Sequence, residues 1–258
     1  MEDLITDMPI EFLPFIFFFI ALFYSSVGFG GGSSYLAILS LFFSDFYEIR
    51  STALLLNICV VSIGTIMFIR HRVFNFKLFW PFLLSSIPLA FLGAQLQLSQ
   101  KIFFLILGGA LILSALFLIL KFLQKNLKSD HFSYPTKFLL GGGVGLLSGI
   151  SGIGGGIFLS PVLNIVNWAN PRVIGSLASV FILVNSIAGL VGLNVAGTFI
   201  INYDFIFKLI IAVVIGGSIG SYLSSKRFNL KFLGILTAIL VFYVGFRLIL
   251  MHGFGISI

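Results

Sequence analysis

Charged residues are scarce in this sequence. Asp, Glu, Lys and Arg make up 9% of the 258 residues, against about 25% in a soluble domain. Hydrophobic residues make up 59%, and Phe alone occurs 32 times. A chain with so few charges cannot cover itself with a water-facing surface, so a soluble globular fold is excluded and lipid is the expected solvent for most of it.

Cysteine is almost absent, since Cys59 is the single one and lies inside an apolar run. It cannot form an intrachain disulfide, and the sequence gives no sign of redox chemistry. No cofactor and no metal site are expected. The net charge of +7 comes from Lys and Arg placed mostly in short loops between apolar runs. That placement orients a membrane protein, so no nucleic-acid partner is predicted.

The few histidines of the sequence argue against a serine protease, although one short motif resembles that of such an enzyme. The sequence GISG at 149–152 matches the GxSG motif of rhomboid-type serine proteases. Such a serine needs a histidine from a later span as its base. The three histidines, His71, His131 and His252, lie in predicted loops or near the chain end. We therefore predict no catalytic residues and no enzyme activity.

Long apolar runs dominate what is present. Six of them have about the 20 residues that a helix needs to cross a hydrocarbon core of roughly 30 Å. They are 51–69, 78–97, 102–120, 173–196, 205–223 and 232–250. None has Asp, Glu, His or Lys at its centre, so an intramembrane proton carrier is not visible. The sequence predicts an all-α, multi-pass protein of the cell (inner or plasma) membrane with the lipid bilayer as its partner.

Two further apolar stretches are interrupted by glycine. Residues 10–43 contain GFGGG at 28–32, and residues 137–168 contain GIGGG at 152–156. Such runs do not continue a helix. Around the second break, the pieces 137–150 and 157–168 would be about 21 and 18 Å long, too short to span. The simple GxxxG of Gly216 and Gly220, by contrast, predicts helix packing.

The two breaks belong to an internal repeat. The glycines of the two breaks match at an offset of 124, Arg50 matches Arg172 at 122, and Gly93 matches Gly220 at 127. Each half reads as a broken segment followed by three spans. We predict a first transmembrane repeat at 1–123, a polar cytoplasmic linker at 124–136 and a second transmembrane repeat at 137–258.

Positive charge chooses between two topologies. If each broken segment crosses once, nine basic residues face the cytoplasm and six face outward. If each re-enters on its own side, the halves become inverted repeats, with eleven inside and four outside. The positive-inside rule favours the inverted arrangement. For the first broken segment, both a crossing and a re-entrant path stay possible, because residues 10–27 form a stretch of 18 residues that could nearly cross the membrane by itself.

An unwound backbone inside a membrane must be buried in protein or line a watery cavity, so both breaks should meet inside the bundle. Half-helices that start there would point free N–H groups and a partial positive charge at one central region. That is an anion site built from main chain and hydroxyl groups. The predicted binding residues are Gly28, Gly30, Gly31, Gly32, Ser33, Ser34, Asn57, Ser151, Gly152, Gly154, Gly155, Gly156 and Ser179, with Ser148 and Ser160 nearby. Packing alone is the alternative role for the glycines.

Asn57 and Ser179 enter that set because each follows its repeat's arginine by seven residues. Matching positions would face the centre from equivalent helices, whereas interhelical hydrogen bonding is the alternative role. Arg50 and Arg172 are expected to be interfacial anchors whose charged heads reach the membrane surface, or to attract anions at the two mouths.

The stretches GFGGGSSYLAIL in the first half and SGISGIGGGIFLSPVL in the second resemble the sulfite exporter TauE/SafE family of membrane permeases. The resemblance covers essentially the whole chain and implies transport of a small sulfur-containing anion, such as sulfite or an organosulfonate. Its motif carries over to the glycines above and to Pro161, while Ala37 stands where the first half would have proline.

The residues and the resemblance together predict a permease or exporter of a small anion that works by alternating access between two repeats. Membrane potential is a sufficient driving force, because an anion that leaves a cell with a negative interior releases roughly 2.3 kcal/mol of free energy per elementary charge per 100 mV. A passive anion channel and a structural membrane protein without transport are the alternatives. The sequence assigns no particular anion, transport direction or oligomeric state.

Overall fold

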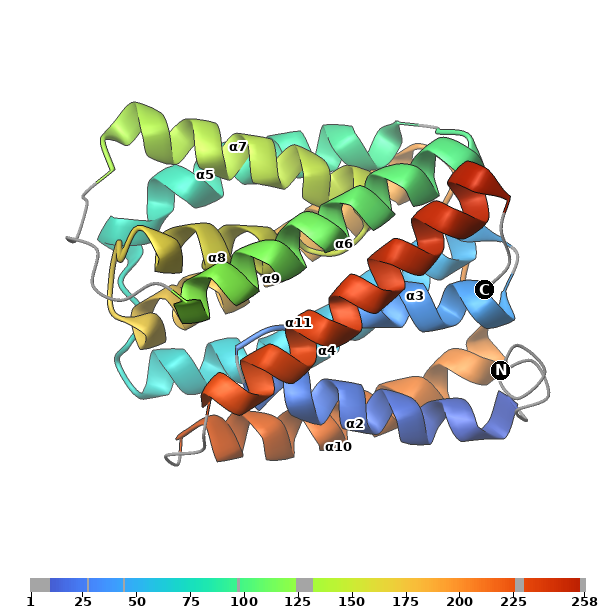
Figure 1. Cartoon of the computed structure of the whole chain (residues 1–258), viewed down its shortest axis with the longest axis horizontal. Coiled ribbons are helices and arrows are strands. Elements are labelled where there is room, and N and C mark those ends of the chain that lie inside the picture. Colours follow the sequence, from blue (N-terminus) through green and yellow to red (C-terminus); the bar gives the residue numbers. More distant parts are fainter. Residues whose placement is uncertain are drawn as a thin grey trace.

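The computed structural model describes residues 10–26, 28–43, 45–96, 98–123, 132–225 and 230–255. Within these ranges the fold is entirely helical (Figure 1). The elements are η1 (Ile10–Phe12), α2 (Leu13–Ser26), α3 (Gly32–Phe42), α4 (Phe46–Arg70), α5 (Phe76–Gln95), α6 (Gln100–Leu123), α7 (Tyr134–Ser151), α8 (Gly156–Ile165), α9 (Pro171–Val195), α10 (Tyr203–Ser225), α11 (Leu230–Ile249) and η2 (Leu250–Phe254). The prediction of an all-α polytopic protein is confirmed.

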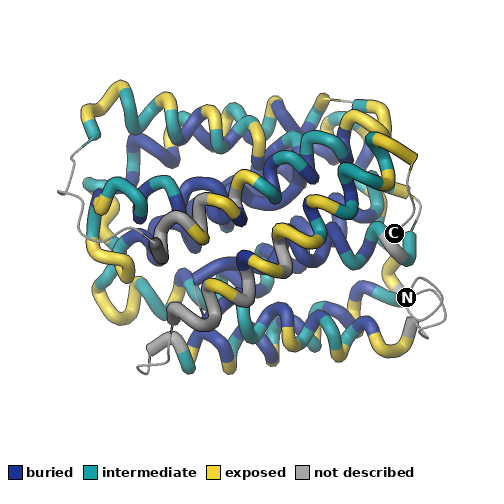
Figure 2. Tube along the Cα trace, viewed as in Figure 1, coloured by how far each residue is buried: buried dark blue, intermediate teal, exposed yellow. Residues whose placement is uncertain are grey.

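All six predicted spans are helices. Over the described residues, four of them are long and apolar enough to cross a membrane: α4, α5, α9 and the part of α10 from Phe205 to Leu223. The other two, α6 and α11, are 24 and 20 residues long. Exposed residues recur along the outer helices (Figure 2). Many of them are large and apolar, such as Phe207, Ile211, Ile215 and Ile219 along α10. This surface suits lipid, not water.

Each glycine run does end one helix and start another. At the first break, Gly28 and Gly31 have φ of 89° and 90°, and at the second, Gly152, Gly154 and Gly155 have φ of 74°, 89° and 81°. Only glycine adopts this left-handed region at low cost. On either side of each break the chain reverses, so that α2 and α3 extend toward one end of the molecule and α7 and α8 toward the other (Figure 1).

The halves are interleaved in space. Helix α2 of the first half packs on α10 of the second, and α7 of the second packs on α5 of the first. The pairs α4·α9 and α6·α11 join matching helices. Glycines bring these pairs close: a Cβ at Gly216 or Gly220 would overlap the backbone of α2, and one at Gly145 would lie 2.5 Å from Ser86 Cα on α5. The predicted packing role of Gly216 and Gly220 is confirmed.

The central pair α4 and α9 sets the register between the halves. Both helices have 25 residues, each is capped by a side-chain oxygen, of Asp45 and Asn170, and each ends in a left-handed residue, Arg72 and Gly197. Every one of these pairs is 125 residues apart. The pairing of Arg50 with Arg172 at 122 is therefore wrong: the counterpart of Arg50 is Gly175.

A second consequence concerns Asn57, whose counterpart is Ile182 and not Ser179. The glycine contacts agree. A Cβ at Gly28 would touch the backbone of Gly175 at 3.4 Å, and one at Gly152 would touch the Arg50 side chain at 3.4 Å. Gly28 and Gly152 are equivalent glycines of the two breaks, and the residues that they contact, Gly175 and Arg50, are 125 residues apart. The same contact therefore occurs in both halves, as the offset of 125 between the central helices requires.

Candidate functional site

Asn57 lies where the two glycine breaks meet. Its Nδ2 donates a hydrogen bond of 2.9 Å to Ile153 O in the second break. A Cβ at Gly30 or Gly32 of the first break would overlap the same carboxamide, and one at Gly154 would lie 3.3 Å from Nδ2. The side chain is fully buried. The prediction that both breaks lie inside the bundle is met by this geometry, with Asn57 between them.

Several buried polar atoms around the breaks have no hydrogen-bond partner among the described residues. They are Tyr35 Oη and Asn57 Oδ1 beside the first break, and Ser148 Oγ and Ser186 Oγ beside the second. A Cβ at Gly31 would lie 2.9 Å from Tyr35 Oη, one at Gly154 would lie 2.9 Å from Ser186 Oγ, and one at Gly155 would lie 3.0 Å from Ser148 Cβ. An unpaired buried polar group costs about 1–3 kcal/mol. Four such groups beside the two breaks fit a site for a polar ligand or water.

Main-chain donors point to the same place. The first main-chain bond of α3 is given by Tyr35 N to Gly31 O, and the first of α8 by Phe158 N to Gly155 O. Each helix therefore begins with N–H groups that have no acceptor in the part of the chain described here, as expected for the first turn. With 11 and 10 residues, both helices carry a partial positive charge at these ends.

The remaining predicted serines are already engaged. Ser34 Oγ lies 2.7 Å from Tyr24 Oη and Ser33 Oγ lies 3.4 Å from it. Ser151 Oγ donates to Leu147 O within α7. Ser179 Oγ lies 3.1 Å from Thr65 Oγ1 and donates to Val61 O at 3.3 Å, so it joins α9 to α4.

Arg50 is placed differently from both of its predicted roles. It is 1% exposed, neither an interfacial anchor nor a residue at a mouth. Its Nη2 donates to Gly149 O at 2.8 Å and to Ala94 O at 3.4 Å, and its guanidinium carbon lies 5.5 Å from the centre of the Phe103 ring. Gly149 O is among the last carbonyls of α7, where the helix dipole is negative and favours a cation. Arg50 thus ties α4 to the segment that leads into the second break.

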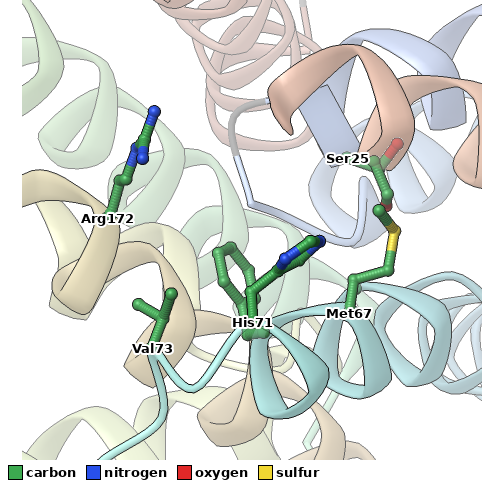
Figure 3. A pocket seen from close by; sticks show the side chains of 8 residues that line it. Ser25, Met67, His71, Val73 and Arg172 are labelled. Atoms are coloured by element: carbon green, nitrogen blue, oxygen red, sulfur yellow. The ribbon is translucent and has the colours of Figure 1, made fainter. Parts of the chain in front are cut away.

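At the opposite end of α4 there is an open cavity of about 280 Å³. It is lined by Ser25, Gly64, Met67, Phe68, His71, Val73, Arg172 and Ser221. Figure 3 shows Arg172 on one side, Ser25 and Met67 on the other, and His71 between them. Because the end of α4 and the start of α9 share this cavity, the two helices are antiparallel.

The chain is similar to known membrane proteins. The family described as "Sulfite exporter TauE/SafE" matches residues 13–248. The chain belongs to the sulfite exporter TauE/SafE family. A curated relative, "Probable membrane transporter protein y4hK" of Sinorhizobium fredii (strain NBRC 101917 / NGR234), is 31% identical over 243 residues, which are 92% of this chain and 97% of that protein. No solved structure matches.

This TauE/SafE protein is a multi-pass membrane transporter and not an enzyme. In the described ranges, no three His, Cys, Asp or Glu side chains are grouped so as to hold a metal ion. Sequence reasoning did not single out Tyr24, Tyr35 or the cavity around His71. The available signal was weak: a tyrosine beside each end of the first break, in helices otherwise rich in apolar residues.

Proposed function

We propose that this protein carries a small, sulfur-containing anion such as sulfite or an organosulfonate, held between the two glycine breaks. The carrying observation is the cluster of unpartnered buried polar atoms at the N-termini of α3 and α8, around Asn57. Hydroxyl and N–H donors at helix N-termini are the groups that bind oxyanions. The name of the family supports the choice of a sulfur oxyanion.

The halves, 1–123 and 137–258 with the linker 124–136, are proposed to be inverted repeats, each with a re-entrant broken segment. Two observations support this: α4 and α9 are antiparallel, and the contacts of one half recur in the other with the partners exchanged. The cavity end carries Arg70, Arg72, Lys77 and Arg172 near helix ends, so the positive-inside rule makes it cytoplasmic. A carrier of this design rocks one repeat against the other.

A carrier should be open to one side at a time, and the counterpart of the cavity at the other end is filled. The counterparts of Ser25 and Ser221 are Gly149 and Ala94, at offsets of 124 and 127, and their carbonyls accept the hydrogen bonds of Arg50. We propose that this is the cytoplasm-open state, with Arg50 holding the outer end closed.

The test measures thermal unfolding of the purified protein with sulfite, thiosulfate, sulfate, sulfoacetate, taurine or chloride. A ligand at 100 times its Kd stabilises the folded state by about 2.7 kcal/mol. Ser186→Ala removes a hydroxyl that has no hydrogen-bond partner among the described residues, so we expect unchanged or higher basal stability. Anion affinity should nevertheless fall about tenfold or more, because a hydrogen bond to a charged ligand contributes about 1.5–3 kcal/mol.

Ser176→Ala is the matched control on the same helix, because Ser176 is equally buried and donates to Val173 O at 2.8 Å. It should lower basal stability by about 1 kcal/mol and leave anion affinity alone. An anion shift that survives Ser186→Ala would contradict the site. In proteoliposomes, saturable flux that follows membrane voltage is expected; single-channel currents would show a channel, and flux set by a pH gradient alone would refute the voltage mechanism.

A further inference from the structure

We infer that the cavity between α2, α4, α9 and α10 is a second anion site, in which Arg172 and Ser221 receive the anion from the cytoplasm before it reaches the glycine breaks. This inference rests on the proposed function and adds residues that lie outside the two glycine motifs. It depends on three observations: the charge at the mouth, a free donor in the wall and the closure of the matching place at the opposite end.

The first observation is that Arg172 is a cation in the cavity wall without a neutralising partner. Its side chain is exposed, and no carboxylate of the described residues pairs with it. The remaining wall offers no carboxylate either: it is made of Ser, Gly, Met, Phe, His and Val. A positive group in a cleft with low-dielectric walls focuses its field into the cleft and raises the local anion concentration.

The second observation is the hydroxyl of Ser221, which is 6% exposed and makes no hydrogen bond to the part of the chain that the structure describes. Ser25, on the same wall, lies on the last turn of α2, three residues before Gly28 of the first break. Since a water molecule takes about 30 Å³ in the liquid, the cavity of about 280 Å³ holds a small oxyanion with several waters. The cavity thus leads a hydrated anion toward the first break.

The third observation is that the matching place in the other half cannot serve this role. Val73 in the cavity wall corresponds to Thr198, at the offset of 125, and Thr198 is buried. Arg172 corresponds to Tyr47, so the arginine of the cavity wall has no counterpart at the other end. The two ends are therefore chemically different, and the arginine site is a property of the cytoplasmic mouth alone.

The experiment reads the field in the cavity with two thiol reagents of opposite charge, and it needs no transport. In a Cys59→Ala background, Val73→Cys is labelled from the cytoplasmic side with anionic sulfonatoethyl or cationic trimethylammonioethyl methanethiosulfonate. The ratio of the labelling rate with the anionic reagent to that with the cationic reagent should be about tenfold higher at this cysteine than for a free thiol. Arg172→Gln should lower this preference clearly, and the part that remains is attributed to Arg70 and Arg72 at the same end. Thr198→Cys, the matched control, should label slowly from either side.

Binding is read by protection of the same cysteine with sulfate or sulfoacetate. Ser221→Ala should raise the anion concentration for half-protection about tenfold, whereas Ser218→Ala on the same helix, whose Oγ donates to Val214 O, should not. A charge preference that ignores Arg172→Gln, or an absence of protection, would overturn the inference. If both effects are present but no anion is transported, the cavity site stands and the proposed function fails.

Discussion

Arg50 offers a sharp test of how the outer end is held closed. Arg50→Met replaces the guanidinium by an uncharged side chain of similar length and leaves no unpaired buried charge. It removes the 2.8 Å hydrogen bond to Gly149 O and the longer one to Ala94 O. We expect the variant to fold, because methionine packs in apolar surroundings and removes the cost of burying a charge.

The expected magnitude follows from the stronger of the two bonds. A hydrogen bond from a charged donor contributes about 1.5–3 kcal/mol, and the helix C-terminus at Gly149 adds to it. A loss of about 2 kcal/mol from the closed state alone corresponds to about 30-fold in the ratio of closed to open outer ends, at about 1.4 kcal/mol per tenfold. The outer end should open that much more often.

The assay is the labelling rate of Thr198→Cys from the outside, in the Cys59→Ala background, with a membrane-impermeant thiol reagent. Thr198 lies next to the segment in which Ile200 N donates to Ser51 Oγ on α4, one residue from Arg50. Arg50→Met should accelerate labelling by up to about 30-fold. Arg172→Met, which removes an exposed arginine at the other end, should not. Equal rates in a folded Arg50→Met protein would refute the gating role of Arg50.

Two further predictions concern stability. Gly145→Ala should destabilise the protein by about 1–3 kcal/mol, because its Cβ would lie 2.5 Å from Ser86 Cα. Gly143→Ala on the same helix is the control: its Cβ would have nothing within 4 Å, so this variant should be more stable by about 0.5–1 kcal/mol. Equal unfolding temperatures of the two variants would contradict the close α5·α7 contact. Arg72→Gly should raise the unfolding temperature. Arg72 has a φ of 54° after the end of α4, where Gly197 stands after the end of α9, and a left-handed non-glycine residue costs about 1–2 kcal/mol. A lower unfolding temperature would contradict this and would mean that Arg72 makes a stabilising contact.

Much of the fold was determined by local sequence. Six apolar runs long enough to cross a bilayer became helices, since span length is a property of consecutive residues. The glycine breaks at 28–32 and 152–156 were also predictable, because a left-handed backbone needs glycine wherever it occurs. The same residues carried the family resemblance, and hence the class of transporter.

The register between the halves was decided only by the tertiary structure. Matching the two arginines in sequence gave an offset of 122, whereas the caps and ends of α4 and α9 give 125. Three residues turn a helix by about 300° and shift it by about 4.5 Å. That difference separates Asn57, which lies between the breaks, from Ser179, which lies against Val61.

Burial of polar residues was also decided by packing between distant segments. The sequence shows that Arg50 and Arg172 are both near helix starts, but only the neighbours of each explain why one is enclosed by α5, α6 and α7 and the other lines an open cavity. Likewise, Tyr35 and Ser186 became candidate ligand groups because the fold buries their oxygens without a partner among the described residues. Hydrogen-bond satisfaction depends on residues far apart in the chain, so no local pattern encodes it.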